Sequence, residues 1–288
     1  MQEKVLLASY TTWKVGGEAL WLAEPKLSEI RELVAWAQER SIPLYFLGRG
    51  SNVLIDDGGL PGLVILTRNS LTELRREGDN IIAGSGVFLP HLSKFAAKEG
   101  FSGFEFLIGI PGTVGGAIAM NAGLTVFRPR EIAETVKDFD VINLDGSIET
   151  LTMKDVQASY RYTDLLNGKR LILQARFSLT EEGNPYEIKN NTFAHLAERK
   201  RKQPLDKLTA GSTFKSPSGS HGAGWYIEQA GLKGVQVGGA RVSPVHANWI
   251  ENLGSATAED IRQLIIHIQS TVESKIGIKL EPEVRFLP

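Results

Sequence analysis

The 288-residue chain has 32 basic and 33 acidic side chains, a formal net charge of −1 and 42% hydrophobic residues. This balance predicts an ordinary soluble globular protein of two or three domains, with no general electrostatic attraction to nucleic acid or to a membrane. The absence of cysteine excludes a disulfide framework, a zinc–thiolate site and a cysteine nucleophile. The N-terminus also lacks the pattern of a signal peptide, so we expect a cytoplasmic protein.

The first region alternates strand, helix and strand, as a small α/β unit does. A short strand follows Gly16 and Gly17, and a helical pattern begins after Ser28. The apolar face of this helix consists of Ile30, Leu33, Val34 and Ala37. Strands are then expected over 43–48, 53–55 and 63–67, separated by the loop GRGSN at 48–52 and the turn DDGG.

The second region is richer in strands. Residues 71–78 and 80–87 have the pattern of paired strands, and a short amphipathic helix over 91–98 ends at Gly100. The stretch FDVINLDGSIETL at 139–151 predicts a hairpin, because Asp145-Gly146 suits a type I′ turn between alternating strands. Another strand is expected over 170–179.

The third region begins near Gly183, where EEGNP marks a boundary. Its first helix ends in the basic run RKRK at 199–202, which we attribute to the helix dipole rather than to nucleic-acid binding. The last helix has Thr257 as its N-cap and ends at Gly277. Its apolar stripe consists of Ile261, Leu264, Ile265, Ile268 and Val272.

Two glycine-containing segments indicate backbone that approaches a ligand closely. The segment GIPGTVGGAIAMNAG at 109–123 is uncharged and contains five glycines, and GRGSN at 48–52 again follows a strand. Bare backbone of this kind forms concave arrays of N–H donors that suit a phosphate. Tight turns within a packed structure explain either segment equally well when it is considered alone.

Several standard catalytic motifs are absent. GRGSNV lacks the third glycine of GxGxxG, and there is no GxxxxGK[ST] or GxSxG. The five histidines form neither HxxxH nor HExxH, so we expect no metal site and no zinc hydrolase.

Three polar clusters remain as candidates for chemistry. They are SYRYTD around Arg161, AGSTFKSPSG with Ser212 and Lys215, and the C-terminal LEPEVRF. In the last cluster, period-2 alternation predicts one strand that carries Glu281, Glu283 and Arg285 on the same face. Each cluster also has a structural interpretation: a capped strand, a surface loop and a solvated strand edge, respectively.

Taken together, these segments resemble the UDP-N-acetylenolpyruvoylglucosamine reductase (MurB) family in its shorter, type II form. The matching stretches are GRGSNVLIDDGG, GIPGTVGGAIAMNAG, YRY, QPLDKLTAGSTFKSP, IEQAGLKG, VQVGGARVSPVHANWIEN and LEPEVRF, in family order. The resemblance implies an α+β fold, with a two-part FAD-binding region of the PCMH/vanillyl-alcohol-oxidase type and a smaller α/β substrate-binding domain. The corresponding limits are 1–68 and 69–183 for the FAD-binding parts and 184–288 for the substrate domain.

The resemblance also implies a reaction. NADPH would reduce FAD, and a hydride would then pass to the enolpyruvyl ether of a UDP-sugar, giving UDP-N-acetylmuramate for peptidoglycan synthesis. The implied partner is this small-molecule substrate, with no nucleic acid and no membrane, and the implied state is a monomer. Two alternatives stay open: another FAD oxidoreductase of the same flavin-domain superfamily, and a non-catalytic UDP-sugar-binding protein.

Residue roles follow from the matched motifs. Arg161 would stabilise negative charge on the substrate carboxylate, Ser212 would donate a proton, and Glu283 would act as a neutral or hydrogen-bonded acid. The implied flavin contacts are Gly48, Arg49, Gly50, Ser51, Asn52, Gly109, Pro111, Gly112, Thr113, Gly115, Gly116, Asn121 and Gly123. The implied substrate contacts are Tyr160, Lys215, Ser216, His246 and Arg285. Two departures from the family pattern are Ser216, in place of asparagine, and Leu124-Thr125, in place of a tyrosine-glycine pair.

Overall fold

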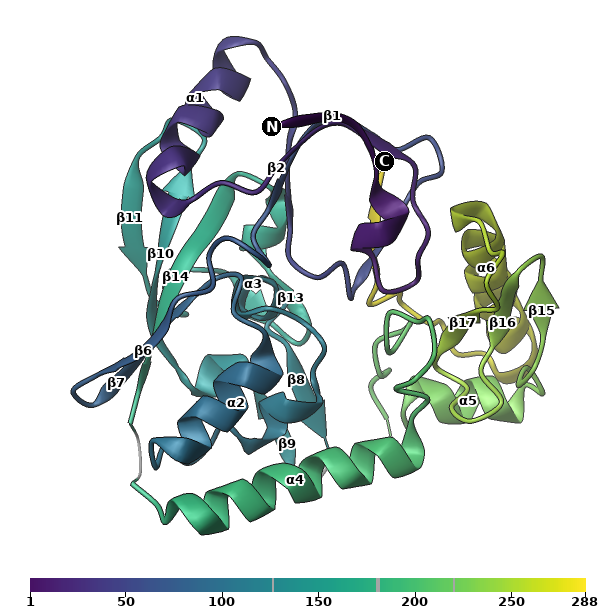
Figure 1. Cartoon of the computed structure of the whole chain (residues 1–288). Helices are drawn as coiled ribbons and strands as arrows, with labels where there is room; N and C mark the ends of the chain where they lie inside the picture. The colour runs from purple at the N-terminus through teal and green to yellow at the C-terminus, as the bar shows by residue number, and fades with distance from the viewer. Residues whose placement is uncertain (126, 180–181, 220) are drawn as a thin grey trace. The chain divides into compact units, whose positions relative to one another are not determined.

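The computed structural model describes residues 1–125, 127–179, 182–219 and 221–288. The chain forms two compact units, and both are discontinuous in sequence. Unit 1 comprises Met1–Glu3, Trp21–Arg49 and Pro61–Arg199, and unit 2 comprises Lys4–Leu20, Gly50–Leu60 and Lys200–Pro288. Figure 1 labels helices and strands of both units. The domain limits at 68 and 183 stay a prediction.

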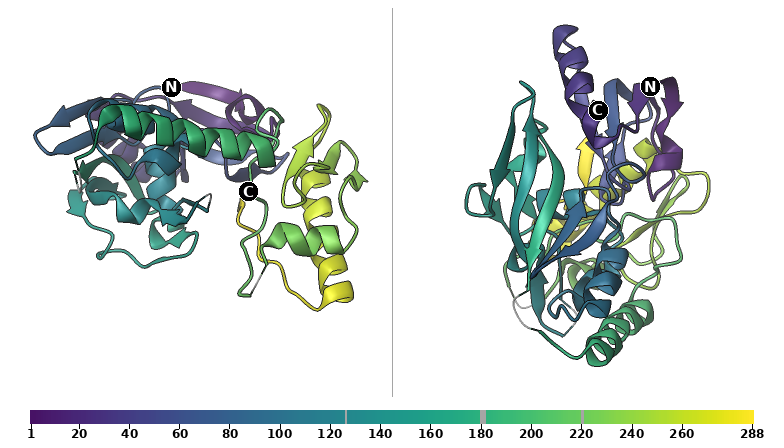
Figure 2. Two further views of the ribbon diagram at one scale, coloured as in Figure 1. Left: turned by 90° about the horizontal axis from the view of Figure 1, so that it is seen from below. Right: turned by 60° about the vertical axis from the view of Figure 1, so that its left-hand side comes forward.

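A five-stranded antiparallel sheet is the centre of unit 1 (Figure 2, right). Its order is β11 (Ile148–Leu151), β10 (Val136–Asn143), β14 (Arg170–Ser178), β7 (Asn80–Gly84) and β6 (Leu74–Glu77). The predicted pairing of the 71–78 and 80–87 segments is confirmed, because Glu77 pairs with Asn80 and Leu74 with Ala83. The hairpin over 139–151 is confirmed as well, with Ile142 opposite Ile148.

The turn of that hairpin differs from the predicted type I′. Asn143 N donates to Ser147 O at 2.9 Å, so the loop has three residues, 144–146. Only Gly146 among them has a positive φ, of 81°, whereas type I′ requires two such residues. The cause is the Asp145 carboxylate, which accepts from Ser147 N at 2.8 Å and closes a local turn at an ordinary φ.

Apolar side chains cover both faces of the unit 1 sheet. On one face, α2 (Leu89–Lys98) and α3 (Val114–Ala119) share a core with Val141 and Ile172. On the other face, α1 (Ile30–Glu39) buries Ile30, Val34 and Ala37 against Ile142, Leu171 and Leu173. The parallel strands β3 (Leu44–Leu47) and β5 (Leu60–Leu66) contribute to this second core, which confirms the predicted α/β pattern. The N-terminal strands are β1 (Gln2–Leu6) and β2 (Glu18–Ala23).

The long helix α4 (Pro185–Lys202) ends in the basic run, as predicted (Figures 1 and 2). One member of that run is not a surface cation, however. Arg199 is only 7% exposed and donates from Nη1 to the carbonyl of Gly109. A Cβ at Gly109 would lie 2.4 Å from Arg199 Cδ, so the fold itself requires glycine at that position. Burial lowers the pKa of Arg199 to about 10, which leaves it charged at neutral pH.

The core of unit 2 lies around α6 (Ala258–Ile276). Its five predicted apolar residues are all buried, Thr257 accepts from Asp260 N at 3.0 Å, and Gly277 ends the helix at φ 77°. The same core includes α5 (Ala223–Gln229) and the antiparallel strands β15 (Gln236–Val237), β16 (Ala240–Val242) and β17 (Ile250–Asn252). From the N-terminal part of the chain, fully buried Trp13 donates from Nε1 to Ile250 O at 2.8 Å.

The C-terminal strand is shorter than predicted. β18 covers only Arg285–Leu287 and runs parallel to β4 (Val53–Ile55), so Glu281 and Glu283 lie outside it. The cause is a change of partner: Glu283 N bonds to Thr213 O, whereas Arg285 N bonds to Asn52 O. A bend at Val284 separates the two pairings, and the expected single strand with three polar residues on one face does not form.

None of the helices in the described ranges is long and apolar enough to cross a bilayer.

Candidate active site

Two of the predicted flavin-binding segments meet within unit 1, at Gly48 and Thr113. A Cβ at Gly48 would lie 2.4 Å from Thr113 Oγ1, so glycine is required for this close approach. Thr113 is the N-cap of α3 and is 1% exposed. Its Oγ1 has no hydrogen-bond partner within the part of the chain that the structure describes. Such a buried hydroxyl usually has a partner, which a ligand can supply.

The surroundings of Thr113 fit an anionic cofactor such as FAD. Gly116 is exposed, and a Cβ there would meet nothing closer than Thr113 Oγ1 at 3.6 Å. Protein packing therefore does not require glycine at 116, but a ligand lying over it would. Arg49 lies with its guanidinium 4.4 Å from the centre of the Phe88 ring. Burial and then the neighbouring Arg68 cation lower the pKa of Arg49, so an anion bound there would relieve repulsion between two cations.

The remaining residues of the GRGSN loop belong to unit 2. Gly50 has φ 60° and lies against the carbonyl of Tyr10, which leaves no space for a side chain. Asn52 Nδ2 donates to Glu283 O at 3.1 Å, and Arg285 N donates to Asn52 O at 3.0 Å. Asn52 thus holds the main chain of the predicted acid Glu283, a contact that the sequence did not indicate.

Arg161 occupies a tight turn between β12 (Ala158–Ser159) and β13 (Tyr162–Thr163). Its φ is 57°, a conformation that costs a residue with a Cβ on the order of 1–2 kcal/mol. The guanidinium donates from Nη2 to Gly123 O at 2.7 Å and lies 4.7 Å from the centre of the Tyr160 ring. Since the side chain is 12% exposed, Arg161 is a cation of restricted orientation.

Ser212 and Glu283 are brought together in unit 2 by one extended segment. Ser212 forms a bridge with Trp249 on one side, and Glu283 N donates to Thr213 O at 2.8 Å on the other. Lys215 N donates to Glu281 O at 2.9 Å, and its Nζ pairs with the Glu281 carboxylate at 2.7 Å. The structure thus places Lys215 against Glu281, which is mostly exposed, while Glu283 is half-buried.

The side chain of Asn248 holds the segment that contains Ser212 and Phe214 through two hydrogen bonds. Its amide accepts from Phe214 N at 3.0 Å and donates to Phe214 O at 2.8 Å, imitating a strand pairing. Asn248 N in turn donates to His246 Nδ1 at 3.2 Å. His246 therefore supports the Ser212 segment through Asn248. The other two predicted substrate residues, Ser216 and Arg285, are exposed.

Comparison with known proteins identifies both parts of the chain. Residues 25–152 match the FAD binding domain family, and residues 203–287 match the C-terminal domain of UDP-N-acetylenolpyruvoylglucosamine reductase. Reductases of this name from Synechococcus sp. (strain WH7803) and Synechocystis sp. are 44% and 42% identical to it. The alignments cover 100% of this chain and 93% and 90% of those proteins. The chain belongs to the UDP-N-acetylenolpyruvoylglucosamine reductase family.

A solved structure agrees with this assignment. The crystal structure of the MurB reductase from Thermus caldophilus matches with a TM-score of 0.83 and 36% identity, over 99% of this chain and 98% of that one. The family resemblance and the α+β fold class expected from the sequence are therefore confirmed. The individual site residues stay predictions.

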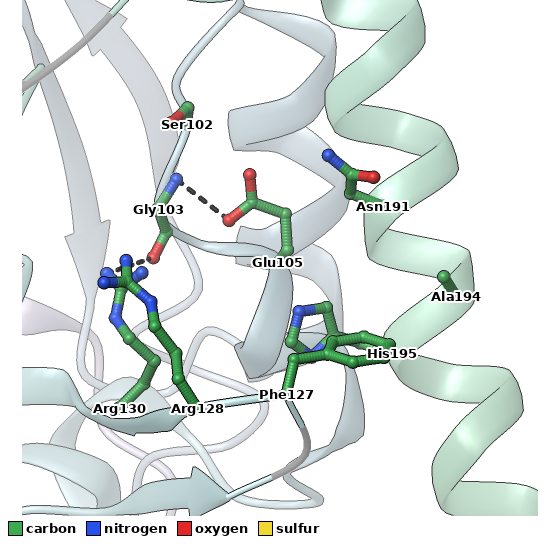
Figure 3. A pocket seen from close by; sticks show the side chains of 9 residues that line it. All are labelled: Ser102, Gly103, Glu105, Phe127, Arg128, Arg130, Asn191, Ala194 and His195. Atoms are coloured by element: carbon green, nitrogen blue, oxygen red, sulfur yellow. Dashed lines mark hydrogen bonds between the residues drawn. The ribbon is translucent and has the colours of Figure 1, made fainter.

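A pocket of about 520 Å³ in unit 1 is lined by none of the predicted site residues (Figure 3). It is lined by Ser102, Gly103, Glu105, Phe127, Arg128, Arg130, Asn191, Ala194 and His195. Several of its polar groups bond to one another: Glu105 accepts from Gly103 N, and Arg130 donates to Gly103 O and pairs with Glu134. The described residues form no group of three or more histidine, cysteine, aspartate or glutamate side chains that could hold a metal ion.

Proposed function

We infer that this protein is an FAD-dependent reductase that uses NADPH to reduce the enolpyruvyl ether of UDP-N-acetylglucosamine enolpyruvate to UDP-N-acetylmuramate, a peptidoglycan precursor. The observation that carries this inference is the 44% identity to a reductase of that name along the whole chain. The orphaned Thr113 hydroxyl and the open space at Gly116 support the cofactor assignment. A cytoplasmic location and a monomeric state stay predictions.

The chemistry supplied by bound FAD is two-electron transfer, from NADPH to the carbon–carbon double bond of the enolpyruvyl ether. Thr113, Gly116 and Arg49 are the unit 1 residues that we propose to hold this cofactor. Their roles are a hydroxyl contact, a bare backbone surface and a cation for the diphosphate, respectively.

We assign Arg161 to the substrate carboxylate. Addition of a hydride to the neighbouring double bond increases the negative charge on that carboxylate, so a fixed cation stabilises the transition state more than the ground state. A guanidinium suits this role because its planar fork matches the two carboxylate oxygens. The anchored guanidinium of this chain has little freedom to reorient, which favours stabilisation without reorganisation.

The proton that completes the reduction is assigned to Ser212 Oγ. Hydride and proton together saturate the double bond, and the overall reaction consumes one NADPH and one proton. A serine hydroxyl is a poor acid, so it needs a polarising neighbour. Glu283 is a proposed neighbour within unit 2, because its main chain is bonded to the residue after Ser212. As a protonated or hydrogen-bonded acid, it would not oppose the developing negative charge.

Two measurements test this function. The purified protein should carry a flavin absorption spectrum, and NADPH oxidation should depend on added UDP-N-acetylglucosamine enolpyruvate. A flavoprotein whose steady-state NADPH oxidation is no faster with that substrate than without it would be a different oxidoreductase of the superfamily. A colourless protein that binds the UDP-sugar would be a non-catalytic binding protein.

The role of Arg161 is tested by Arg161→Lys. Lysine keeps the positive charge but loses the planar fork, so we expect turnover to fall by more than about tenfold while the substrate KM changes less. Turnover close to that of the wild type would show that Arg161 does not stabilise the transition state.

A further inference from the structure

We infer that Glu131, acting together with Asn121, is a positioning residue that orients the Arg161 guanidinium for the substrate carboxylate. This inference rests on the proposed function, since it takes Arg161 as the partner of that carboxylate. Glu131 is the last residue of β9 (Pro129–Glu131), which pairs with β8 (Gly123–Thr125) and places Glu131 opposite Gly123.

Two main-chain carbonyls form the seat of the Arg161 guanidinium. Arg161 Nη2 donates to Gly123 O at 2.7 Å, and Nη1 reaches Asn121 O at 3.5 Å. Both acceptors are neutral carbonyls, which fix the direction of the guanidinium and carry no net charge themselves. A Cβ at Gly123 would lie 2.8 Å from Arg161 Nη1 and 2.2 Å from Arg130 O, so the seat excludes any larger residue at 123.

The Glu131 carboxylate is held at a distance from the Arg161 guanidinium. Its Oε1 lies 3.7 Å from Arg161 Nη1, beyond the 2.7–2.9 Å of a charge-assisted hydrogen bond. The other oxygen, Oε2, accepts from Asn121 Nδ2 at 2.7 Å. The carboxylate is thus bound to the amide and attracts the guanidinium from a distance. It orients the cation without forming the short bond that would compete with a substrate carboxylate.

Asn121 and Glu131 are themselves held in place by hydrogen bonds. Asn121 is 3% exposed, and its Nδ2 also reaches Ser159 O, in the strand that leads into the Arg161 turn, at 3.2 Å. Glu131 N donates to Glu134 Oε1 at 2.7 Å, which fixes the main chain of Glu131. One amide therefore connects the carboxylate, the arginine turn and the segment after α3.

The test measures two half-reactions separately: reduction of the flavin by NADPH, and reoxidation of the reduced flavin by the enolpyruvyl sugar. In Glu131→Gln, we expect the rate of flavin reoxidation by the enolpyruvyl sugar to fall roughly tenfold, while flavin reduction by NADPH is unchanged. The matched control is Glu149→Gln, which removes a carboxylate of similar exposure, 40% against 33%, that pairs with Arg170 instead. The control should behave like the wild type in both half-reactions.

A double-mutant cycle distinguishes positioning from a merely structural effect. If Glu131 acts through Arg161, adding Glu131→Gln to Arg161→Lys should slow reoxidation no further, whereas independent effects would multiply. A binding measurement needs no turnover: Glu131→Gln should weaken binding of UDP-N-acetylmuramate, which keeps the carboxylate, to the oxidised protein. Glu131→Asp, which keeps the charge but withdraws it by one methylene, should fall between Glu131→Gln and the wild type.

Three results would overturn the inference. The first is wild-type reoxidation and product affinity in Glu131→Gln while Arg161→Lys is impaired, which would leave the proposed function intact. The second is multiplication of the two effects in the double variant. The third is a wild-type rate in Arg161→Lys, which would remove the assigned role of Arg161 and this inference together.

Discussion

Main-chain contacts position Ser212 and Glu283. Ser212 pairs with Trp249, and Glu283 donates its N–H to Thr213 O. These contacts survive a change of side chain. Arg161 differs, because its guanidinium donates to the carbonyl of Gly123, a contact that a substitution alters.

Ser212→Ala should separate the two half-reactions. Flavin reduction by NADPH should stay near the wild-type rate, because we assign the Ser212 proton only to the reduction of the enolpyruvyl sugar. The second half-reaction should fall by about 10²-fold or more, the usual range for removal of a positioned acid. Stopped-flow absorbance follows both steps. Equal slowing of both would place Ser212 at the flavin or in the fold.

The two C-terminal glutamates should respond differently. Glu283→Gln keeps a donor and should retain more reoxidation activity than Glu283→Asp, which withdraws the group by one methylene. Glu281→Gln should leave the chemical step almost unchanged, because the exposed Glu281 carboxylate pairs with Lys215. Reoxidation rates of the three variants are the quantities to compare. Loss of activity in Glu281→Gln alone would reverse the assignment of the two residues.

At the scale of elements, the sequence predicted those whose patterns are local. The stripe of α6, its Thr257 cap and the Gly277 end are all formed within one segment. The predictions were wrong where a side chain or a distant segment determines the backbone conformation. The Asp145 carboxylate accepts from Ser147 N and changes the type of the hairpin turn. Pro282 pairs with Phe214 and therefore does not extend β18. Glu131 had no sequence signal, and Asn248 had only its place in a stretch that matches the family, because their importance depends on the strand or loop that folding places against them.

The pairing of β10 with β14 should make stability depend on acid pH through Asp140. Hydrogen bonds from Arg176 first, and then from Gln174 and Thr150, lower the pKa of Asp140 from 3.8 to about 2. Because the pKa of Asp140 is lower in the folded state, its ionised carboxylate stabilises the fold at any pH above its pKa in the unfolded chain. This contribution is lost as the pH falls from about 4 to about 2. In urea unfolding over that range, the wild type should lose its advantage over Asp140→Asn. Curves that stay parallel would contradict the assignment.

At the scale of the whole molecule, Trp13 joins the N-terminal stretch of unit 2 to its C-terminal part. The ring is fully buried and bonded to Ile250 O. Trp13→Ala should reduce the free energy of unfolding by about 3–5 kcal/mol. Trp13→Phe should cost about 1–3 kcal/mol, mainly through the unsatisfied carbonyl. Trp225, 43% exposed in the same unit, is the control, and its alanine variant should lose less, about 0.5–1.5 kcal/mol in urea unfolding, through its ring contacts with His221 and Tyr226.

The discontinuity of unit 2 sets an order on biosynthesis. Residues 4–20 and 50–60 leave the ribosome long before 200–288, which complete their core. At roughly 5–20 residues per second, the stretch containing Trp13 waits about 12–47 s for its partner Ile250, which lies 237 residues later. During that interval, apolar side chains such as those of Trp13 and Leu54 lack their final packing. Nascent chains should therefore engage holdase chaperones through these early segments until residues 200–288 have been synthesised.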